Sequence, residues 1–349
     1  MRYPARMQSD AQKQIQPGQR AVLLDLFRII LCIGVVVYHY TPECPSSGPF
    51  MVNGFFVMSG FLLGVSFLSG KAFDVCRFYG NKARRLLPMF LFALVLGFWY
   101  RVRVGDGALP PGPEGEWWPF YPVKWLSYYN TPLWYMGVEF VLLFLAPFFC
   151  YLFAGKGRLE LCTLGMALLT AFYFSRVPEN APFGNGLYYS PLARSWQFMT
   201  GIVVARLFAY IRSKGVAERP FFRWSTYALF AVFLVLGGVL MVVKQVKQLN
   251  YWNYTFEFDV YTTLFFALLV PLLFVQTPRV SPRVSRSLAW MAALTYPIFL
   301  LHVAVYHHCC FYVWKLSKWG FSLTAAAVTV LLSAGLLWLE SRWLQKKKG

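Results

Sequence analysis

Charged residues are scarce in this sequence. Only 13% of its 349 residues are Asp, Glu, Lys or Arg, whereas 58% are hydrophobic. A soluble domain has about 25% charged and about 45–50% apolar residues. The hydrophobic residues also form blocks of about 18–20 residues, the length that crosses the hydrocarbon core of a bilayer. The composition therefore excludes an ordinary soluble enzyme and indicates a polytopic membrane protein.

Acidic residues are especially few. There are 14 Asp and Glu against 33 Lys and Arg, which gives a formal net charge of +19. A surplus of this size is also typical of proteins that bind nucleic acids. In a membrane protein, however, Lys and Arg collect in cytoplasmic loops. This topological explanation is sufficient, and we expect no nucleic-acid partner.

The chain also lacks a CxxC pair among its seven cysteines, which argues against a zinc ribbon or a thioredoxin-like site. The run His307-His308-Cys309-Cys310 contains residue types that bind metals. Adjacent residues of a helix point in different directions, so these four cannot easily converge on one ion. We therefore expect no metal cofactor.

Hydropathy predicts an all-α bundle of about ten spans that form one integral domain, residues 21–341. A flexible cytoplasmic tail, residues 1–20, precedes it, and a basic cytoplasmic tail, residues 342–349, follows it. We find no internal repeat. The expected spans are residues 22–40, 50–69, 86–103, 133–153, 159–175, 191–211, 225–244, 257–275, 288–306 and 320–340.

An even number of spans places both termini on the same side of the membrane. The tails and loops on that side contain more than twice as many Lys and Arg residues as the loops on the other side. The positive-inside rule then predicts that both termini are cytoplasmic.

The first span contains three ionisable residues, Asp25, Arg28 and His39. Eleven helical residues make almost a whole number of turns, so Arg28 and His39 share a face and lie about 16 Å apart along the axis. Asp25, one turn before Arg28, can pair with it. An unpaired charge in a span costs roughly 2.5–3.5 kcal/mol, so such residues usually face the protein interior or a wet cavity. The alternative is an interfacial ion pair with a histidine that snorkels to the opposite surface.

Small residues interrupt the second span, where Gly54, Ser59, Gly60 and Gly64 follow Asn53. Small residues let two helices approach closely, and this packing role is enough to explain them.

A basic cluster, Lys82, Arg84 and Arg85, comes just before Pro88. It is either the cytoplasmic flank of a span or a clamp for phosphates. Lys82 and Arg85 share a helix face, as a clamp requires.

Two further spans each carry a polar residue in an apolar surrounding. Glu139 follows the segment PLWYMGV, and His302 ends the segment YPIFLLH. A lone histidine in such a helix is more often a hydrogen-bonded packing residue than a functional one.

These five segments, in this order, resemble the acyltransferase-3 family of integral-membrane acyltransferases. Asp25 and Arg28 followed by His39 are similar to the family's opening LDxxR and histidine motif, and FFVMSGFLL, residues 55–63, is similar to its FFxxSGFLL segment. The basic segment before Pro88, the PLWxxxxE segment and the late YxxxLLH segment correspond as well.

Two departures from the family pattern stand out. Lys82 replaces the first arginine of an RxxR pair, which keeps the charge but loses the planar fork of a guanidinium. Asn53 stands where many relatives have an acidic residue.

The resemblance implies an acetyl-CoA-dependent O-acetyltransferase of the cell (inner) membrane. It would transfer an acyl group, most often acetyl, from acyl-CoA to a hydroxyl of a carbohydrate or glycan, such as a surface polysaccharide. Membrane lipid surrounds such a protein, and whether it forms a homo-oligomer stays open.

We assign roles to the candidate residues on this basis. His39 is the base or the acyl acceptor, because an imidazole with an ordinary pKa of about 6.5 is partly neutral near pH 7. Arg28 positions the donor, Asp25 holds Arg28, and Glu139 orients an imidazole or the acceptor. The basic cluster binds the donor's phosphates. The remaining site candidates are Asn53, Ser59, Trp134, Tyr296 and His302.

Two alternatives stay open. The buried Asp, Arg, Glu and His residues could form a relay in a multi-pass transporter or flippase. The loop aromatics Trp117, Trp118, Tyr121 and Trp125 could stack on sugar rings, or they could form an aromatic belt at the membrane interface.

Overall fold

The computed structural model of the chain describes residues 22–40, 48–68, 73–104, 121–176, 187–215, parts of 219–235, 256–275, 280–312 and 318–346. Most of these residues are helical, and no strand occurs among them. The all-α prediction is therefore confirmed for this part of the chain. The predicted tail at residues 1–20 and the loop tryptophans Trp117 and Trp118 lie outside the described residues.

The described elements are, in chain order, α2 (Val22–Tyr40), α3 (Gly48–Leu68), α4 (Val75–Val104), α5 (Tyr121–Tyr129), α6 (Leu133–Phe144), α7 (Ala146–Ala154), α8 (Arg158–Phe174), the short 3-10 helix η3 (Leu187–Tyr189), α9 (Pro191–Ser213), α11 (Phe256–Val275), α12 (Pro282–Tyr312) and α13 (Lys318–Lys346).

Six of these helices are long and apolar enough to cross a membrane: α2, α3, α4, α11, α12 and α13. The pair α6 and α7, bent by 49° at the break between them, makes a seventh if it forms one span. Pro147 lies at the start of α7, where its missing N–H and its ring oppose continuation of α6. The predicted tail at residues 342–349 begins within α13, which continues to Lys346.

The other three predicted spans do not meet this criterion of length and apolar character in the described part of the chain. Helix α8 has 17 residues, at the lower limit of a span. Helix α9 begins with several polar residues, including Arg194 and Gln197. Most of the predicted span at 225–244 lies outside the described residues. Ten spans therefore stay a prediction, as do the sides of the two termini.

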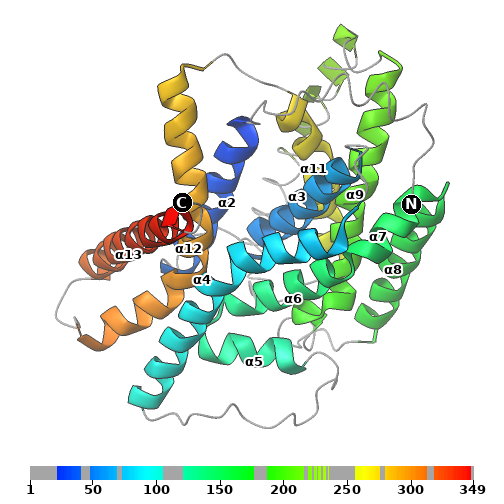
Figure 1. Cartoon of the computed structure of the whole chain (residues 1–349). Helices are drawn as coiled ribbons and strands as arrows, with labels where there is room; N and C mark the ends of the chain where they lie inside the picture. The colour runs from blue at the N-terminus through cyan, green and yellow to red at the C-terminus, as the bar shows by residue number, and fades with distance from the viewer. Residues whose placement is uncertain are drawn as a thin grey trace. The chain divides into compact units, whose positions relative to one another are not determined.

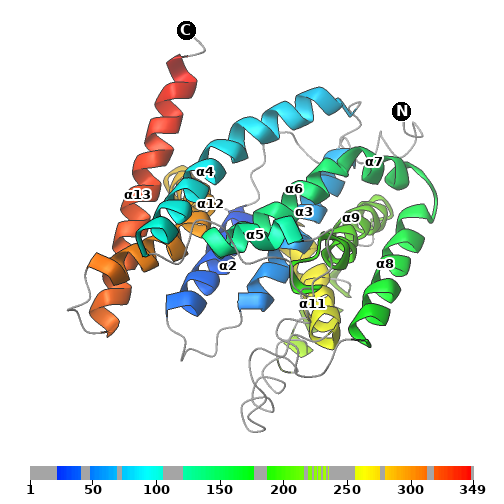
Figure 2. The same cartoon turned by 90° about the horizontal axis from the view of Figure 1, so that it is seen from below.

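The chain divides into two compact units. The unit that we call the α12 unit consists of Val22–Val52, Tyr79–Gly137 and Pro278–Gly349. Within it, α12 packs against α2 and α13 (Figures 1 and 2).

The α9 unit includes Asn53–Phe78 and Val138–Thr277. Here α9 packs against α8 and α11, the green and yellow helices of Figure 1. Helix α9 begins with Pro191, whose lack of an N–H is harmless in a first turn. The hydroxyl of Ser190 accepts a hydrogen bond from the Ala193 N–H at 3.3 Å and so caps the helix.

The small residues of α3 serve close packing against α9. A Cβ atom on Gly60 would overlap the backbone carbonyl of Phe198, and one on Gly64 would lie 2.7 Å from the Ala205 Cβ. The packing explanation is therefore sufficient at these two glycines.

Candidate functional site

The polar side of α2 faces the protein. Leu26, Ile30 and Ile33 form an exposed stripe, with exposed fractions of 39%, 51% and 55%. Asp25 is buried, and Cys32 is also buried and donates to the Thr295 carbonyl of α12 at 3.4 Å. The ionisable residues thus lie on the side of α2 that other helices cover, and the hydrophobic stripe is the side available to lipid.

Asp25 and Arg28 form the ion pair that their spacing predicts. The distance between Arg28 Nη1 and Asp25 Oδ1 is 3.9 Å, and the Arg28 side chain is 29% exposed. The guanidinium is therefore partly accessible while its charge is balanced by a buried carboxylate.

At the other end of α2, His39 lies beside His302 of α12. Their ring centroids are 5.1 Å apart, with the ring planes tilted by 50°. His302 is completely buried, whereas His39 is partly exposed. Two residues that are 263 positions apart in the sequence therefore form one imidazole pair.

Hydrogen bonds define the orientation of the His302 ring. Its Nδ1 lies 2.8 Å from the Phe299 carbonyl and 3.3 Å from the Ile298 carbonyl. Carbonyl oxygens only accept, so Nδ1 is the nitrogen that donates, and Nε2 of the neutral ring has a lone pair. Nε2 is buried and has no hydrogen-bond partner among the described residues. The pair thus includes one imidazole nitrogen that can accept a proton or a hydrogen bond.

A tyrosine network supports this imidazole pair. Tyr40 donates to the His302 carbonyl at 2.9 Å, and its oxygen lies 3.0 Å from the Thr329 hydroxyl of α13. The Ser322 hydroxyl donates to the Tyr40 carbonyl at 3.1 Å. These bonds fasten the end of α2 to α12 and α13, which limits movement of His39 relative to His302.

The other two histidines of the chain belong to the same part of the α12 unit. His307 stacks on Tyr100 of α4 with centroids 5.0 Å apart, and His308 lies 5.5 Å from the same ring. Among the residues that the structure describes, no three His, Cys, Asp or Glu side chains are arranged to hold a metal ion.

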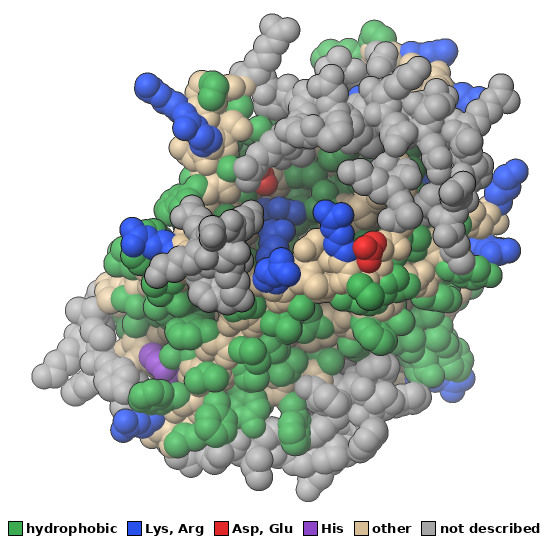
Figure 3. Space-filling view, viewed as in Figure 1, with side chains coloured by type: hydrophobic (Ala, Val, Ile, Leu, Met, Phe, Trp, Pro, Cys, Tyr) green, Lys and Arg blue, Asp and Glu red, His purple; other side chains and the backbone are tan. Residues whose placement is uncertain are grey.

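The basic cluster lies in the first half of α4. Arg84 and Arg85 are exposed and Lys82 is partly buried. Figure 3 shows Lys and Arg side chains gathered near the middle of the visible face, where Figure 1 draws α4. The Tyr296 hydroxyl of α12 donates to the Leu86 carbonyl at 2.7 Å, so the cluster lies beside the middle of α12.

The α9 unit contains a second polar cluster, which is fully enclosed. Arg194 of α9 and Asp259 of α11 form an ion pair with an Nη1–Oδ1 distance of 3.2 Å, and their side chains are 0% and 1% exposed. Asn53 of α3 donates to Asp259 at 2.8 Å and accepts from Arg194 at 3.1 Å. Gln197 accepts from Arg194 at 3.1 Å. The cluster therefore joins α3, α9 and α11 through charge-assisted hydrogen bonds.

Three of the remaining candidates are distributed over both units. Glu139, on α6, is buried and belongs to the α9 unit, as does the partly exposed Ser59 of α3. Trp134 is buried in the α12 unit, where its ring contacts Tyr135 edge to face.

A family model for an acyltransferase domain matches residues 22–338, nearly the whole chain. The chain belongs to the acyltransferase-3 family. No curated protein and no solved structure matches it significantly. Family membership and the apolar helices identify a membrane acyltransferase, and they do not favour the transporter alternative.

Most of the candidate site residues of this acyltransferase-3 protein lie in the α12 unit. It contains Asp25 with Arg28, His39 with His302, and the basic cluster with Tyr296.

The sequence analysis missed Arg194, Asp259 and Gln197, and it did not connect Tyr40 to the histidine pair. Arg194 and Asp259 are charged residues within predicted spans, which is the signal that singled out Arg28. The same criterion, applied to every span, would have found both.

Proposed function

We propose that this acyltransferase-3 protein transfers an acyl group, acetyl in the first instance, from cytoplasmic acyl-CoA to a hydroxyl of a carbohydrate or glycan. The observation that carries the proposal is the position of His39. It lies on the covered side of α2, partly accessible, and 5.1 Å from the ring of a second, buried imidazole.

In the chemical step, His39 acts as a general base. Its ring nitrogen takes the proton of the acceptor hydroxyl while the hydroxyl oxygen attacks the thioester carbonyl. The C–S bond then breaks, and the leaving CoA sulfur receives the proton from the imidazolium. The alternative is nucleophilic catalysis, in which the acyl group first forms an N-acyl bond with His39 and then moves to the acceptor oxygen.

His302 positions His39. Because Nδ1 of His302 donates to backbone carbonyls, its Nε2 can accept a hydrogen bond from the N–H of His39. That bond would leave the second nitrogen of His39 as the base and would stabilise the imidazolium that forms. In the same way, a buried partner orients the catalytic histidine of serine hydrolases through a hydrogen bond.

The donor enters from the cytoplasmic side. Lys82, Arg84 and Arg85 bind its phosphates, and Arg28, held by Asp25, lies between the inner surface and the thioester. Helix geometry separates Arg28 from His39 by about 16 Å along the axis of α2. A donor that extends along this helix from the inner surface therefore brings its thioester to His39. Both chain termini are cytoplasmic in this proposal, and the membrane is the inner membrane.

The remaining candidates have supporting roles. Glu139, which is on α6 with Trp134, is proposed to contact the acceptor. Asn53 belongs to the Arg194 cluster, and Ser59 lies on the same helix, α3, directly before Gly60. Tyr296 holds α12 beside the basic cluster. Exposed aromatic residues, such as the 41% exposed Trp125, offer a surface for sugar rings.

The test is covalent transfer of radiolabelled acetyl from acetyl-CoA to membrane glycans by the purified, reconstituted protein. His39→Gln should abolish transfer, because the amide provides no base, while Cys310→Ser on the exposed side of α12 should keep it. Retained transfer by the His39 variant would rule out its catalytic role. A substrate that changes sides of the membrane without acquiring label would instead support a flippase.

A second measurement separates the two chemical routes. Without acceptor, nucleophilic catalysis should leave labelled acetyl on the wild-type protein, whereas general-base catalysis should not. Mass spectrometry of the peptide that contains His39 would detect this adduct.

A further inference from the structure

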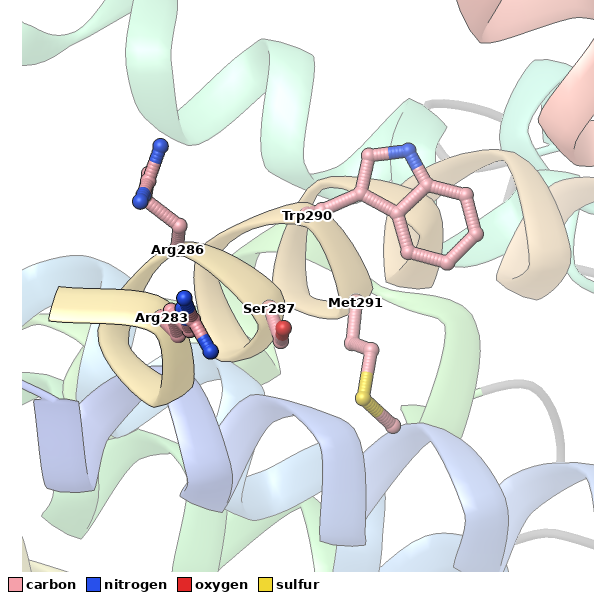
Figure 4. Close-up of a pocket in the computed structure, with 5 residues that line it drawn as sticks. All are labelled: Arg283, Arg286, Ser287, Trp290 and Met291. Carbon is pink, nitrogen blue, oxygen red and sulfur yellow. The ribbon is translucent and has the colours of Figure 1, made fainter. Parts of the chain in front are cut away.

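The first turns of α12 carry a basic and aromatic surface that is separate from the histidine pair. Arg283, Arg286, Ser287, Trp290 and Met291 line a cavity of about 510 Å³. Figure 4 looks onto this cavity, with the two guanidinium groups at one end, the indole and the thioether at the other, and Ser287 between them. We call it the α12 cavity.

The basic end of the cavity is suited to phosphate. Arg283 and Arg286 are one turn apart and exposed, and no carboxylate pairs with either within the described part of the chain. Arg286 Nε donates to the Pro282 carbonyl at 3.3 Å, which orients its terminal N–H groups. Two guanidinium groups on one helix face can bind phosphate oxygens with paired hydrogen bonds.

The other end of the cavity is suited to a flat ring. Trp290 is 54% exposed, and no described aromatic ring or cation contacts its indole. Met291, beside it, is 44% exposed. Trp338 of α13 is equally exposed, but the Arg342 guanidinium covers its ring at 4.2 Å. Trp290 therefore offers an exposed indole on which a base can stack.

We propose that the α12 cavity binds the phosphorylated adenosine end of the acyl donor. Arg283 and Arg286 hold phosphate groups, and Trp290 stacks on the adenine. The proposal rests on the acyl-CoA function proposed above and extends it to a nucleotide subsite. All five lining residues belong to one face of α12, so the cavity is open on the side away from this helix.

The positions along α12 agree with one extended donor. Trp290 precedes His302 by twelve residues, which is about 18 Å of helix. This is comparable to the length of an extended pantetheine arm. Tyr296, which holds the Leu86 carbonyl beside the basic cluster of α4, lies between them in the helix. The donor would thus meet the α12 cavity, the basic cluster and the histidine pair in this order.

An anionic lipid headgroup has the same phosphate chemistry, and basic sites near the cytoplasmic ends of spans bind such headgroups. A headgroup contains no flat ring for the exposed indole. The exposed indole therefore favours a nucleotide over a lipid headgroup as the ligand of the α12 cavity. The experiment distinguishes these two ligands.

The test measures binding of phosphoadenosine phosphate, the nucleotide fragment of CoA without its pantetheine arm, to the full chain in phosphatidylcholine nanodiscs. The double substitution Arg283→Ala with Arg286→Ala should weaken binding by at least about tenfold, because it removes charge-assisted hydrogen bonds. Trp290→Ala should weaken it by at least about fivefold through loss of stacking. The matched control, Trp338→Ala with Arg342→Ala, removes a cation–π pair of α13 outside the cavity and should leave the affinity unchanged.

Unchanged nucleotide affinity in both cavity variants would overturn the proposal. A second measurement compares the thermal stability of each protein in phosphatidylglycerol and in phosphatidylcholine nanodiscs. If the cavity variants lose the stabilisation by phosphatidylglycerol but keep their nucleotide affinity, the cavity binds lipid and the proposal is overturned. The probe carries no acyl group, so its binding is measured whether or not the protein transfers acetyl. If transfer occurs, the cavity variants should raise the KM for acetyl-CoA much more than the KM for acetyl-pantetheine.

Discussion

Neutralising one partner of the buried Arg194–Asp259 pair should destabilise the α9 unit strongly. Arg194 donates to Asp259, Asn53 and Gln197, and its Nε donates to the Tyr188 carbonyl at 2.9 Å. Both charged side chains are almost completely inaccessible. Removal of one charge leaves the other buried without its counterion.

The expected magnitude follows from this enclosure. Breaking a buried ion pair by removing one partner costs about 3–5 kcal/mol. We expect Arg194→Met and Asp259→Asn each to lower the free energy of unfolding by about this amount. The double substitution removes both charges, so its cost should fall short of the sum by about 1–3 kcal/mol.

Unfolding of the detergent-solubilised protein with a denaturing detergent, followed by circular dichroism, measures these free energies. The control is Glu160→Gln, which neutralises the 44% exposed partner of Arg206 and should cost less than about 1 kcal/mol. If the two single substitutions cost no more than this control, or if their effects simply add, the pair does not hold α9 to α11.

Three further predictions concern packing, donor binding and the histidine pair. Gly60→Ala should lower the free energy of unfolding by about 1–3 kcal/mol, because its Cβ meets the Phe198 backbone. Gly165→Ala, which has open space, should be neutral or slightly stabilising in the same assay. Lys82→Ala with Arg85→Ala should weaken acetyl-CoA binding at least about tenfold in calorimetry. Arg103→Ala, at the other end of α4, is its control, and equal affinities would refute the clamp. His302→Ala should reduce kcat by about 10²–10⁴ with little change in KM, whereas a changed KM alone would contradict positioning of His39.

The predictions from sequence were most successful where the information is local. The spacing of Asp25 and Arg28 within one helix predicted their ion pair, and periodicity placed them on the covered side of α2. The length of the apolar segments predicted the six helices that can cross a membrane. This prediction is local because the thickness of the bilayer sets the number of apolar residues that a span needs.

Long-range relations were beyond the same reasoning. Nothing near His39 in the sequence indicates that its neighbour is His302, which is 263 positions away. The bend between α6 and α7 was likewise missed, because one proline can either kink a span or divide it.

The sequence by itself determined that this is a helical membrane protein of the acyltransferase-3 family, since hydrophobic length and ordered motifs are properties of the chain. Only the tertiary structure decided which polar side chains meet. It paired His39 with His302 and enclosed Arg194 with Asp259, and it exposed Trp290 beside two arginines. The physical reason is that a helix specifies which face is polar, whereas the packing of distant helices specifies what that face contacts.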